Sequence, residues 1–320
     1  MNANKERLTG LALVVLATAC WATSGILINW VTTGSGISPV GLAFWRDLST
    51  FAVLFIGLGV TRPGALRVRR RDLPWLAAMG ALSIGFFHVL WNMAVMLNGA
   101  SIATVIQSNA PIFVTVMAWL VWREPLTARK LTAIALAFAG TALIARLDRL
   151  QGMHISALGL GVGLLSAICY GTFSLFGKKL RGSYDSWTIL LYAFGFATLA
   201  LAPFQVGQPL PWPLPPAVLA SFAALIFLPT VLGFGLYTIG LGRLQASVAS
   251  ITATTEIPFA ALMAYFFLGE RLDGWQILGA ALVVVGVVLI SLPRRNAARL
   301  QEPAELVPGE SLSGNAEGGR

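Results

Sequence analysis

The chain has 320 residues, of which 57% are hydrophobic and only 11% are charged, and its formal net charge is +9. Soluble domains carry about 25% charged residues, so this composition excludes a water-soluble fold and predicts an integral membrane protein. The basic residues form short clusters between apolar runs, which argues against nucleic-acid binding. Cys20 and Cys169 both fall inside apolar runs, so they predict neither a disulfide framework nor a metal site, and no cofactor is expected.

Ten apolar runs follow one another along the chain. A bilayer core about 30 Å thick needs about 20 apolar residues per helix. The runs cover approximately residues 8–31, 40–60, 73–97, 101–122, 131–146, 155–177, 186–203, 217–241, 246–268 and 275–292. Residues 203–216 carry no charge and six prolines, which lack the N–H that a helix needs, so this segment is predicted to be an external loop.

The positions of Lys and Arg predict the orientation, because cytoplasmic connections are enriched in both residues. With both termini inside, only Arg146, Arg149 and Arg271 lie outside, and Arg46 lies within a span. All other basic residues are then cytoplasmic: Lys5, Arg7, Arg62, Arg67, Arg69, Arg70, Arg71, Arg123, Arg129, Lys130, Lys178, Lys179, Arg181, Arg243, Arg294, Arg295, Arg299 and Arg320. Residues 294–320, rich in Glu, Gly, Ser and Arg, are predicted to form a disordered cytoplasmic tail.

The two halves of the chain resemble each other. The segment GLALVVLATACWAT from Gly10 aligns with GLGVGLLSAICYGT from Gly159, and ASIA at Ala100 aligns with ASVA at Ala246, a shift of 146 residues. The same shift pairs Gly140 with Gly286 and Ala133 with Gly279, and it pairs Glu124 with Glu270. Each half contains an odd number of helices, so the copies are expected to be inverted relative to each other, as in many secondary transporters. The predicted repeats are residues 1–150 and 151–293.

Small residues recur on the last helix of each half. Ala133 and Gly140 are seven residues apart, as are Gly279 and Gly286, so each pair lies on one helix face. Small residues on one face let a neighbouring helix approach closely. We therefore expect these two helices to be scaffold elements that pack against other helices.

These features resemble the EamA-type drug/metabolite transporter superfamily. The resemblance rests on WAT after Cys20, the ASxA openings at Ala100 and Ala246, the mid-helix prolines, and REPLT and GERLD at the ends of the fourth and ninth spans; it covers about residues 8–293. It implies an all-α integral membrane protein with ten helices around a central cavity and both ends cytoplasmic. Bacterial YddG-type amino-acid exporters are the suspected relatives, which implies a bacterial cytoplasmic (inner) membrane. Many members place Glu directly before the ninth-helix proline, whereas here Ile257 separates Glu256 from Pro258.

Two prolines fall near the middle of equivalent spans. Pro111 and Pro258 each remove one helix hydrogen bond, which would free the carbonyl of Gln107 or Thr254. Broken helices at corresponding places in two halves are typical of a transporter binding site, although a kink that only serves packing remains the alternative. Polar residues around the two breaks are expected to line a cavity in part: Gln107, Ser108, Asn109, Thr252, Thr254 and Thr255.

Two charged residues lie inside predicted spans. Glu256 is expected near the midplane, where it would bind a substrate ammonium group, carry a coupled proton, or make a structural hydrogen bond. Arg46 would bind a substrate carboxylate, form a structural pair, or extend to the outer surface. Its sequence neighbour Asp47 is not expected to neutralise it, because adjacent helical residues do not face each other.

Aromatic and polar residues also recur at equivalent positions. His88, Trp91 and Asn92 share one helix face, Tyr237 is the repeat equivalent of Trp91, and Trp21 is equivalent to Tyr170. These residues would form a cavity wall that contacts an apolar or aromatic side chain, or they would be ordinary core.

The sequence therefore predicts a carrier, with no enzyme activity, because it contains no catalytic constellation. We expect the protein to export small metabolites, and most of all neutral and aromatic amino acids, by alternating access. A carrier for sugars, nucleosides or drug-like solutes, and a passive channel, remain alternatives. The expected partners are an amino-acid-like solute and the lipid bilayer, with proton coupling as one option, and a monomer is favoured.

Overall fold

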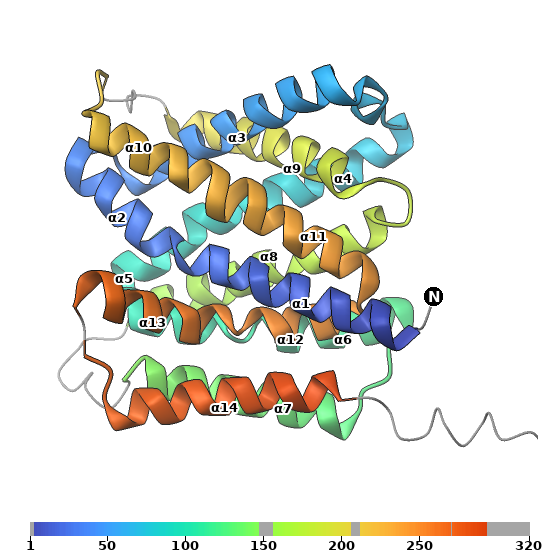
Figure 1. Ribbon diagram of the computed structural model, residues 1–320, viewed down its shortest axis with the longest axis vertical. Helices are drawn as coiled ribbons and strands as arrows, with labels where there is room; N and C mark the ends of the chain where they lie inside the picture. Colours follow the sequence, from blue (N-terminus) through green and yellow to red (C-terminus); the bar gives the residue numbers. More distant parts are fainter. Residues whose placement is uncertain (1–2, 147–155, 206–211, 270, 293–320) are drawn as a thin grey trace, which may run out of the picture.

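The structure is a computed structural model that describes residues 3–146, 156–205, 212–269 and 271–292, and it is built of helices (Figure 1). No strand occurs within these ranges, so the all-helical prediction is confirmed there. The predicted tail at 294–320, most of the connection around Arg149, and Glu270 lie outside the described residues.

The first half of the chain begins with a helix that is broken in its middle. Its helices are α1 (Ala3–Ala22), α2 (Ser24–Ser35), α3 (Pro39–Thr61), α4 (Leu73–Gly80), α5 (Phe87–Gln107), α6 (Ala110–Trp122) and α7 (Ala128–Ile144). The break at Thr23 corrects the expectation of one continuous first helix over residues 8–31. The Thr23 hydroxyl donates to the carbonyl of Cys20 over 2.7 Å, which closes the turn between α1 and α2.

The second half has an unbroken first helix. Its helices are α8 (Ala157–Leu180), α9 (Ser186–Leu201), α10 (Pro216–Leu225), α11 (Phe234–Arg243), α12 (Ala246–Ala253), α13 (Glu256–Leu268) and α14 (Gly274–Ser291). α10 begins at Pro216, the last proline of the predicted loop, and Ala202–Gln205 form a short 3₁₀ turn at the start of that loop; residues 206–211 of the loop lie outside the described residues.

Nine helical segments among the described residues are long and apolar enough to cross a bilayer. One of them, Asn4–Ser35, combines α1 and α2. Two others, Arg70–Asn98 and Ile102–Trp122, are counted separately although α5 is helical from Phe87 to Gln107. The fifth predicted span, residues 131–146, is not among these nine segments and corresponds to α7, which has 17 residues and therefore stands at the lower limit of about 17 residues for a spanning helix.

α7 and α14 lie side by side along one edge of the molecule (Figure 1). A Cβ built on Gly140 would meet the backbone oxygen of Gly279, and one built on Gly286 would meet the backbone oxygen of Ala133 at 3.0 Å. In the repeat, Gly140 is equivalent to Gly286 and Gly279 is equivalent to Ala133, so the two contacts are equivalent to each other. The close approach predicted from the small residues is confirmed, and the two helices pack with the reciprocity that a two-fold relation between the halves requires.

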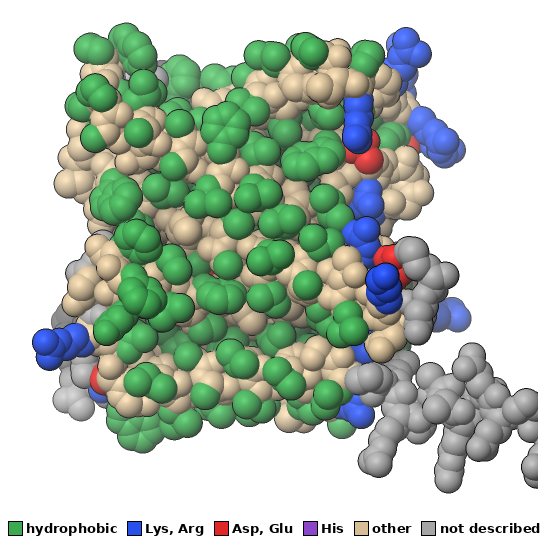
Figure 2. All heavy atoms as spheres, in the orientation of Figure 1, with side chains coloured by type: hydrophobic (Ala, Val, Ile, Leu, Met, Phe, Trp, Pro, Cys, Tyr) green, Lys and Arg blue, Asp and Glu red, His purple; other side chains and the backbone are tan. Residues whose placement is uncertain are grey.

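Most of the charged side chains visible in this view gather at one end of the helices, with a smaller group at the opposite end, while apolar side chains cover the flank (Figure 2). Several basic side chains join elements at the more highly charged end: Arg7 donates to the carbonyl of Ile290, Arg243 contacts Glu6 at 2.9 Å, and Lys178 donates to the carbonyl of Leu241 at 3.3 Å. We call this region the basic end. The apolar flank fits contact with lipid tails, because a bilayer core solvates no charge.

Candidate functional site

Two helices are interrupted at equivalent places. α5 ends at Gln107 and α6 begins at Ala110, while α12 ends at Ala253 and α13 begins at Glu256. The interrupting pairs are Ser108 with Asn109 and Thr254 with Thr255, which are 146 residues apart. Both pairs form tight turns: Asn109 N donates to the carbonyl of Ile106 and Thr255 N to that of Thr252, each over 3.1 Å. The predicted breaks are present, and their positions follow the repeat more closely than the prolines do.

The sequence predicts that Pro258 frees the carbonyl of Thr254, but in the structure this carbonyl has a hydrogen-bond donor. The Thr254 carbonyl accepts a hydrogen bond from the Ile257 backbone N–H at 3.1 Å. The chain tightens from an α-type to a 3₁₀-type turn, so the N–H one residue before the proline takes the place of the missing donor. The polarity of this break therefore comes from side chains, and Glu256 is the first residue after it.

A cavity of about 420 Å³ lies against both breaks. This volume is within the range of about 300–1,000 Å³ typical of small-molecule sites. Of the residues singled out from the sequence, the cavity is lined by Trp21, Arg46, His88, Trp91, Gln107, Ser108, Pro111, Tyr170, Glu256 and Thr254. The structure thus brings together side chains from both halves of the chain.

Other candidates from the sequence lie off this cavity. Asn92 and Pro258 are not among its lining residues, and Tyr237 lines a smaller neighbouring cavity instead. Asn109 and Thr252 bond to their own helices: Asn109 Nδ2 donates to the carbonyl of Ile106 at 2.8 Å, and the Thr252 hydroxyl to that of Val248 at 2.8 Å. The donor of each side chain is therefore used by a carbonyl of its own helix segment, and neither residue lines the cavity.

Sequence reasoning missed part of the wall because these residues are small or apolar and carry no chemical signal. α2 contributes several of them, since the break at Thr23 turns its first residues toward the cavity. The additional lining residues are Ala22, Ser24, Gly25, Ile28, Phe87, Thr104, Phe234, Ser250, Ala253, Ile257 and Ala260.

Arg46 lies in a charged cluster with Asp47 and His88. Arg46 Nε is 3.5 Å from Asp47 Oδ1, His88 Nδ1 is 3.6 Å from Asp47 Oδ2, and an Arg46 Nη atom contacts His88 Nε2. The expectation that Asp47 cannot neutralise Arg46 is wrong. The backbone directions of adjacent residues do diverge, but the long arginine side chain bends back toward the carboxylate while His88 from α5 joins both.

The cavity presents both signs of charge. Among its lining residues Glu256 is the only acid and Arg46 the only arginine or lysine, and Asp47 is fully buried behind the wall. Trp21, Trp91, Tyr170 and Phe234 supply aromatic surface. A solute with one cationic group, one anionic group and an apolar side chain would find a complement for each part.

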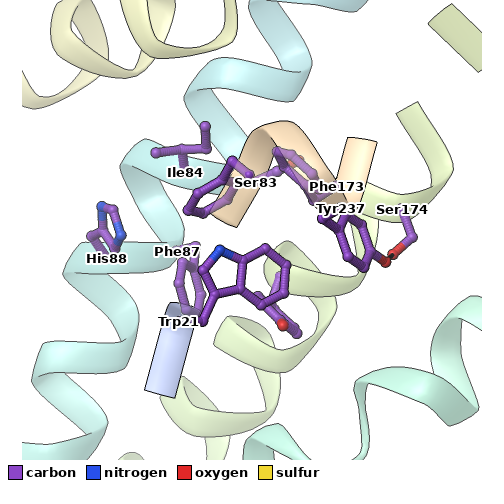
Figure 3. A pocket seen from close by; sticks show the side chains of 10 residues that line it. Trp21, Ser83, Ile84, Phe87, His88, Phe173, Ser174 and Tyr237 are labelled. Atoms are coloured by element: carbon purple, nitrogen blue, oxygen red, sulfur yellow. Dashed lines mark hydrogen bonds between the residues drawn. The ribbon is translucent and has the colours of Figure 1, made fainter. Parts of the chain in front are cut away.

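A small inner cavity of about 20 Å³ adjoins the large one, sharing Trp21, Phe87, His88, Tyr170 and Phe234 with it (Figure 3). This volume holds about one water molecule. The Trp21 ring is 5.0 Å from the rings of both Phe234 and Tyr237, and the Tyr237 hydroxyl bonds the Ser174 hydroxyl at 2.7 Å (Figure 3). These contacts make the aromatic side of the site a packed, preformed wall.

Two π-helical segments flank this wall, and the sequence did not predict them. They cover Ala81–Phe86, between α4 and α5, and Ile226–Gly233, between α10 and α11. Shifted by 146 residues, the first falls inside the second. Ser83 and Ile84 of the first segment line the inner cavity. Such wide turns are frequent at functional sites. A sequence signal for them is weak because both segments are almost wholly apolar, so a shift in helical periodicity leaves little contrast in hydropathy.

The basic end is closed by a network around Glu124. Its Oε1 accepts from the backbone N–H of Ala246 at 2.9 Å, and its Oε2 contacts the Ser247 hydroxyl and lies 3.1 Å from Lys130 Nζ. Glu124 and Lys130 are 8% and 2% exposed. In contrast, α2, α5 and α13, which line the cavity, lead toward the opposite end of the molecule (Figure 1).

Comparison with known proteins identifies the family. The sequence profile of the EamA-like transporter family matches this chain twice, over residues 8–146 and 157–292. The chain belongs to the EamA-like transporter family. It is therefore a multi-pass membrane transporter, and the resemblance inferred from its motifs is confirmed.

Several known proteins are similar to this chain over nearly their whole length. A probable terminal-alkyne amino-acid exporter of Streptantibioticus cattleyicolor is 30% identical, with 90% of this chain and 95% of that protein covered. A probable amino-acid metabolite efflux pump of Escherichia coli is 24% identical, covering 87% of this chain and 93% of that one. The inner membrane transporter YicL of Salmonella typhimurium is 25% identical, covering 91% and 97%.

The fold also matches a solved protein. A crystal structure superimposes with a TM-score of 0.74 and 18% identity, covering 91% of this chain and 98% of the other. At this identity the match establishes the EamA-like helical fold alone.

Proposed function

We propose that this EamA-type transporter exports neutral and aromatic amino acids by alternating access through the 420 Å³ cavity. The observation that carries the proposal is the presence of Arg46, Glu256 and an aromatic wall around one space of suitable size. An amino acid presents a carboxylate, an ammonium group and a side chain, which these three features complement. The names of the Streptantibioticus and Escherichia relatives agree with this substrate class.

The proposal includes ten spanning helices arranged as two inverted repeats, residues 1–150 and 151–293, with α7 as the short fifth helix. The double family match, the equivalent helix breaks and the reciprocal α7–α14 contacts support it. Because Lys and Arg gather at the basic end, we assign that end and both termini to the cytoplasm of a bacterial inner membrane. The Glu124 network then closes the cytoplasmic side, and the cavity belongs to a state that faces outward.

In this proposal Arg46 receives the carboxylate, Glu256 receives the ammonium group or a coupled proton, and the aromatic wall receives the side chain. Gln107, Ser108 and Thr254 supply hydrogen bonds at the breaks. Because the two breaks sit at equivalent places in the halves, a rocking motion of one half against the other would expose the same groups first to one side and then to the other.

Counterflow in proteoliposomes tests the proposal. Purified protein is reconstituted with unlabelled L-phenylalanine inside, and uptake of labelled L-phenylalanine from outside is compared with uptake into protein-free liposomes. A carrier gives saturable uptake that internal substrate accelerates, whereas an open channel gives neither effect. A parallel panel of amino acids, nucleosides and sugars tests the substrate class, and uptake restricted to sugars or nucleosides would refute the assignment.

A further inference from the structure

Asp47 is a buried carboxylate that the proposed binding site does not use. Its side chain is fully buried, and in the part of the chain that the structure describes neither of its oxygens has a hydrogen-bond partner. Its neighbours are Arg46 Nε at 3.5 Å and His88 Nδ1 at 3.6 Å. Both distances are beyond the usual hydrogen-bond range, so charge rather than hydrogen bonding holds the carboxylate in place.

Arg46 stands between this hidden carboxylate and the cavity. Arg46 is 8% exposed and lines the cavity, whereas Asp47 does not line it. A buried guanidinium requires a counter-charge, because an isolated ion in a low-dielectric interior is costly. Among the described ion pairs, the carboxylate that pairs with Arg46 is that of Asp47.

His88 links the two charged groups. A guanidinium only donates hydrogen bonds, and Arg46 Nη2 lies closer to His88 Nε2 than to Nδ1, which is 3.3 Å away; we therefore assign Nε2 as the acceptor and place the proton of the neutral ring on Nδ1. Nδ1 is the atom that faces Asp47 Oδ2. If the 3.6 Å distance between His88 Nδ1 and Asp47 Oδ2 shortened by less than 1 Å, His88 would donate a hydrogen bond to Asp47 that does not depend on Arg46.

We propose that Asp47 is the internal counter-ion of the transport site, which Arg46 exchanges for the carboxylate of an incoming amino acid while His88 Nδ1–H becomes the partner of Asp47. Asp47 is thus a positioning residue that competes with the substrate for Arg46. The exchange keeps the buried arginine paired in the empty and the loaded state, so neither state contains an isolated cation. The inference rests on the proposed function, because it assumes a substrate with a carboxylate.

The decisive experiment compares L-phenylalanine with L-phenylalaninamide, which lacks the free carboxylate. Binding of both is measured by calorimetry on the purified full-length protein, for wild type and Asp47→Asn. The substitution removes the competitor of the substrate carboxylate, so L-phenylalanine binds Asp47→Asn about fivefold or more tightly than wild type, while the affinity for the amide stays within about twofold. An unchanged ratio of the two affinities in folded Asp47→Asn protein overturns the inference.

Asp185→Asn is the matched control. Asp185 caps α9 by accepting from the backbone N–H groups of Trp187 and Thr188, and Asn caps helices about as well as Asp. It lies away from the cavity, so this variant changes neither affinity. If the wild-type protein does not prefer L-phenylalanine to its amide, the proposed function itself fails. If the wild-type protein has this preference and Asp47→Asn leaves it unchanged, only the counter-ion role of Asp47 fails.

A second measurement requires no change at Asp47. The chain has two histidines, so His154→Gln leaves His88 as the only source of a ¹⁵N-histidine signal. Saturating L-phenylalanine shifts the Nδ1 resonance of His88 as its proton engages Asp47, and L-phenylalaninamide at the same occupancy does not. Identical His88 spectra with both compounds would overturn the proposal even where Asp47→Asn fails to fold.

Discussion

Glu124 caps the first turn of α12, with Oε1 accepting from the backbone N–H of Ala246 at 2.9 Å. A carboxylate at a helix N-terminus satisfies an amide that has no partner in the helix and interacts favourably with the helix dipole. Glu124 follows α6, while Ala246 begins α12 of the other half, so this hydrogen bond joins the two halves of the chain at the basic end. Lys130 of α7 also belongs to this junction, because its Nζ lies 3.1 Å from Glu124 Oε2.

Glu124→Ala is expected to destabilise the protein strongly. It removes the cap of α12 and the carboxylate that contacts buried Lys130, and breaking a buried ion pair from one side costs about 3–5 kcal/mol. Thermal unfolding in detergent measures the effect, with a fall in Tm expected. Glu6→Gln is the control, because Glu6 pairs with Arg243 at a site that is about one-third exposed, where a pair contributes about 0–1 kcal/mol. Equal Tm values for the two variants would contradict the role given to Glu124.

Gly140→Leu is expected to separate α7 from α14. A side chain at Gly140 would collide with the backbone of Gly279 and with Val283, and overpacking of a close contact costs about 1–3 kcal/mol or more. Gly161→Leu is the matched control, because a Cβ on Gly161 meets nothing within 4 Å. The yield of monodisperse protein and its Tm are compared. A Gly140→Leu protein as stable as Gly161→Leu would show that the close contact does not hold the two helices together.

The parts of the fold that could be predicted are those that composition and periodicity encode. Apolar length predicted the spans, and the shift of 146 residues predicted the equivalence of the two broken helices. Small residues seven apart predicted that α7 and α14 each have a close helical neighbour, although not that they are neighbours of each other. Each of these depends on a property repeated over many residues, so one local exception does not hide it. The side chains at the breaks were also predictable in part, because polar residues next to a mid-membrane proline are unusual.

The rest depends on single side chains or single turns. The break at Thr23 has no proline to mark it, and the π-helical segments lie in almost wholly apolar sequence, where the change in residues per turn leaves no contrast in hydropathy. The contact between Arg46 and Asp47 requires a flexible side chain to bend back, which helix geometry alone does not reveal. Asn109 and Thr252 look available in sequence, yet each donates to a carbonyl of the preceding helical turn.

Gly233→Ala is expected to alter side-chain selectivity. A Cβ at Gly233 would lie 2.8 Å from Trp21 Cδ1 and 2.9 Å from Nε1, so the indole must move away from the π-helical segment and into the space of the cavity. Binding of L-phenylalanine should weaken relative to that of L-alanine, because the larger side chain needs the aromatic wall in its present position. Calorimetry on both ligands gives the ratio, with Gly161→Ala as control. An unchanged ratio would mean that Trp21 does not contact the substrate side chain.

Glu256→Gln is expected to impair export of L-phenylalanine while leaving the fold intact. Gln keeps the size of the side chain and its hydrogen-bonding capacity, but it has no charge for an ammonium group and cannot exchange a proton. Glu256 is the first residue of α13 and lines the cavity, so the substitution alters the site rather than the packing.

Counterflow of L-phenylalanine at several pH values, in proteoliposomes that contain equal amounts of folded protein, measures the effect of Glu256→Gln. If Glu256 only binds the ammonium group, the variant loses affinity at every pH. If it carries a coupled proton, residual exchange becomes independent of pH while net export against a gradient is lost. Normal export with the wild-type dependence on pH would remove Glu256 from the mechanism and leave a structural hydrogen bond as its role.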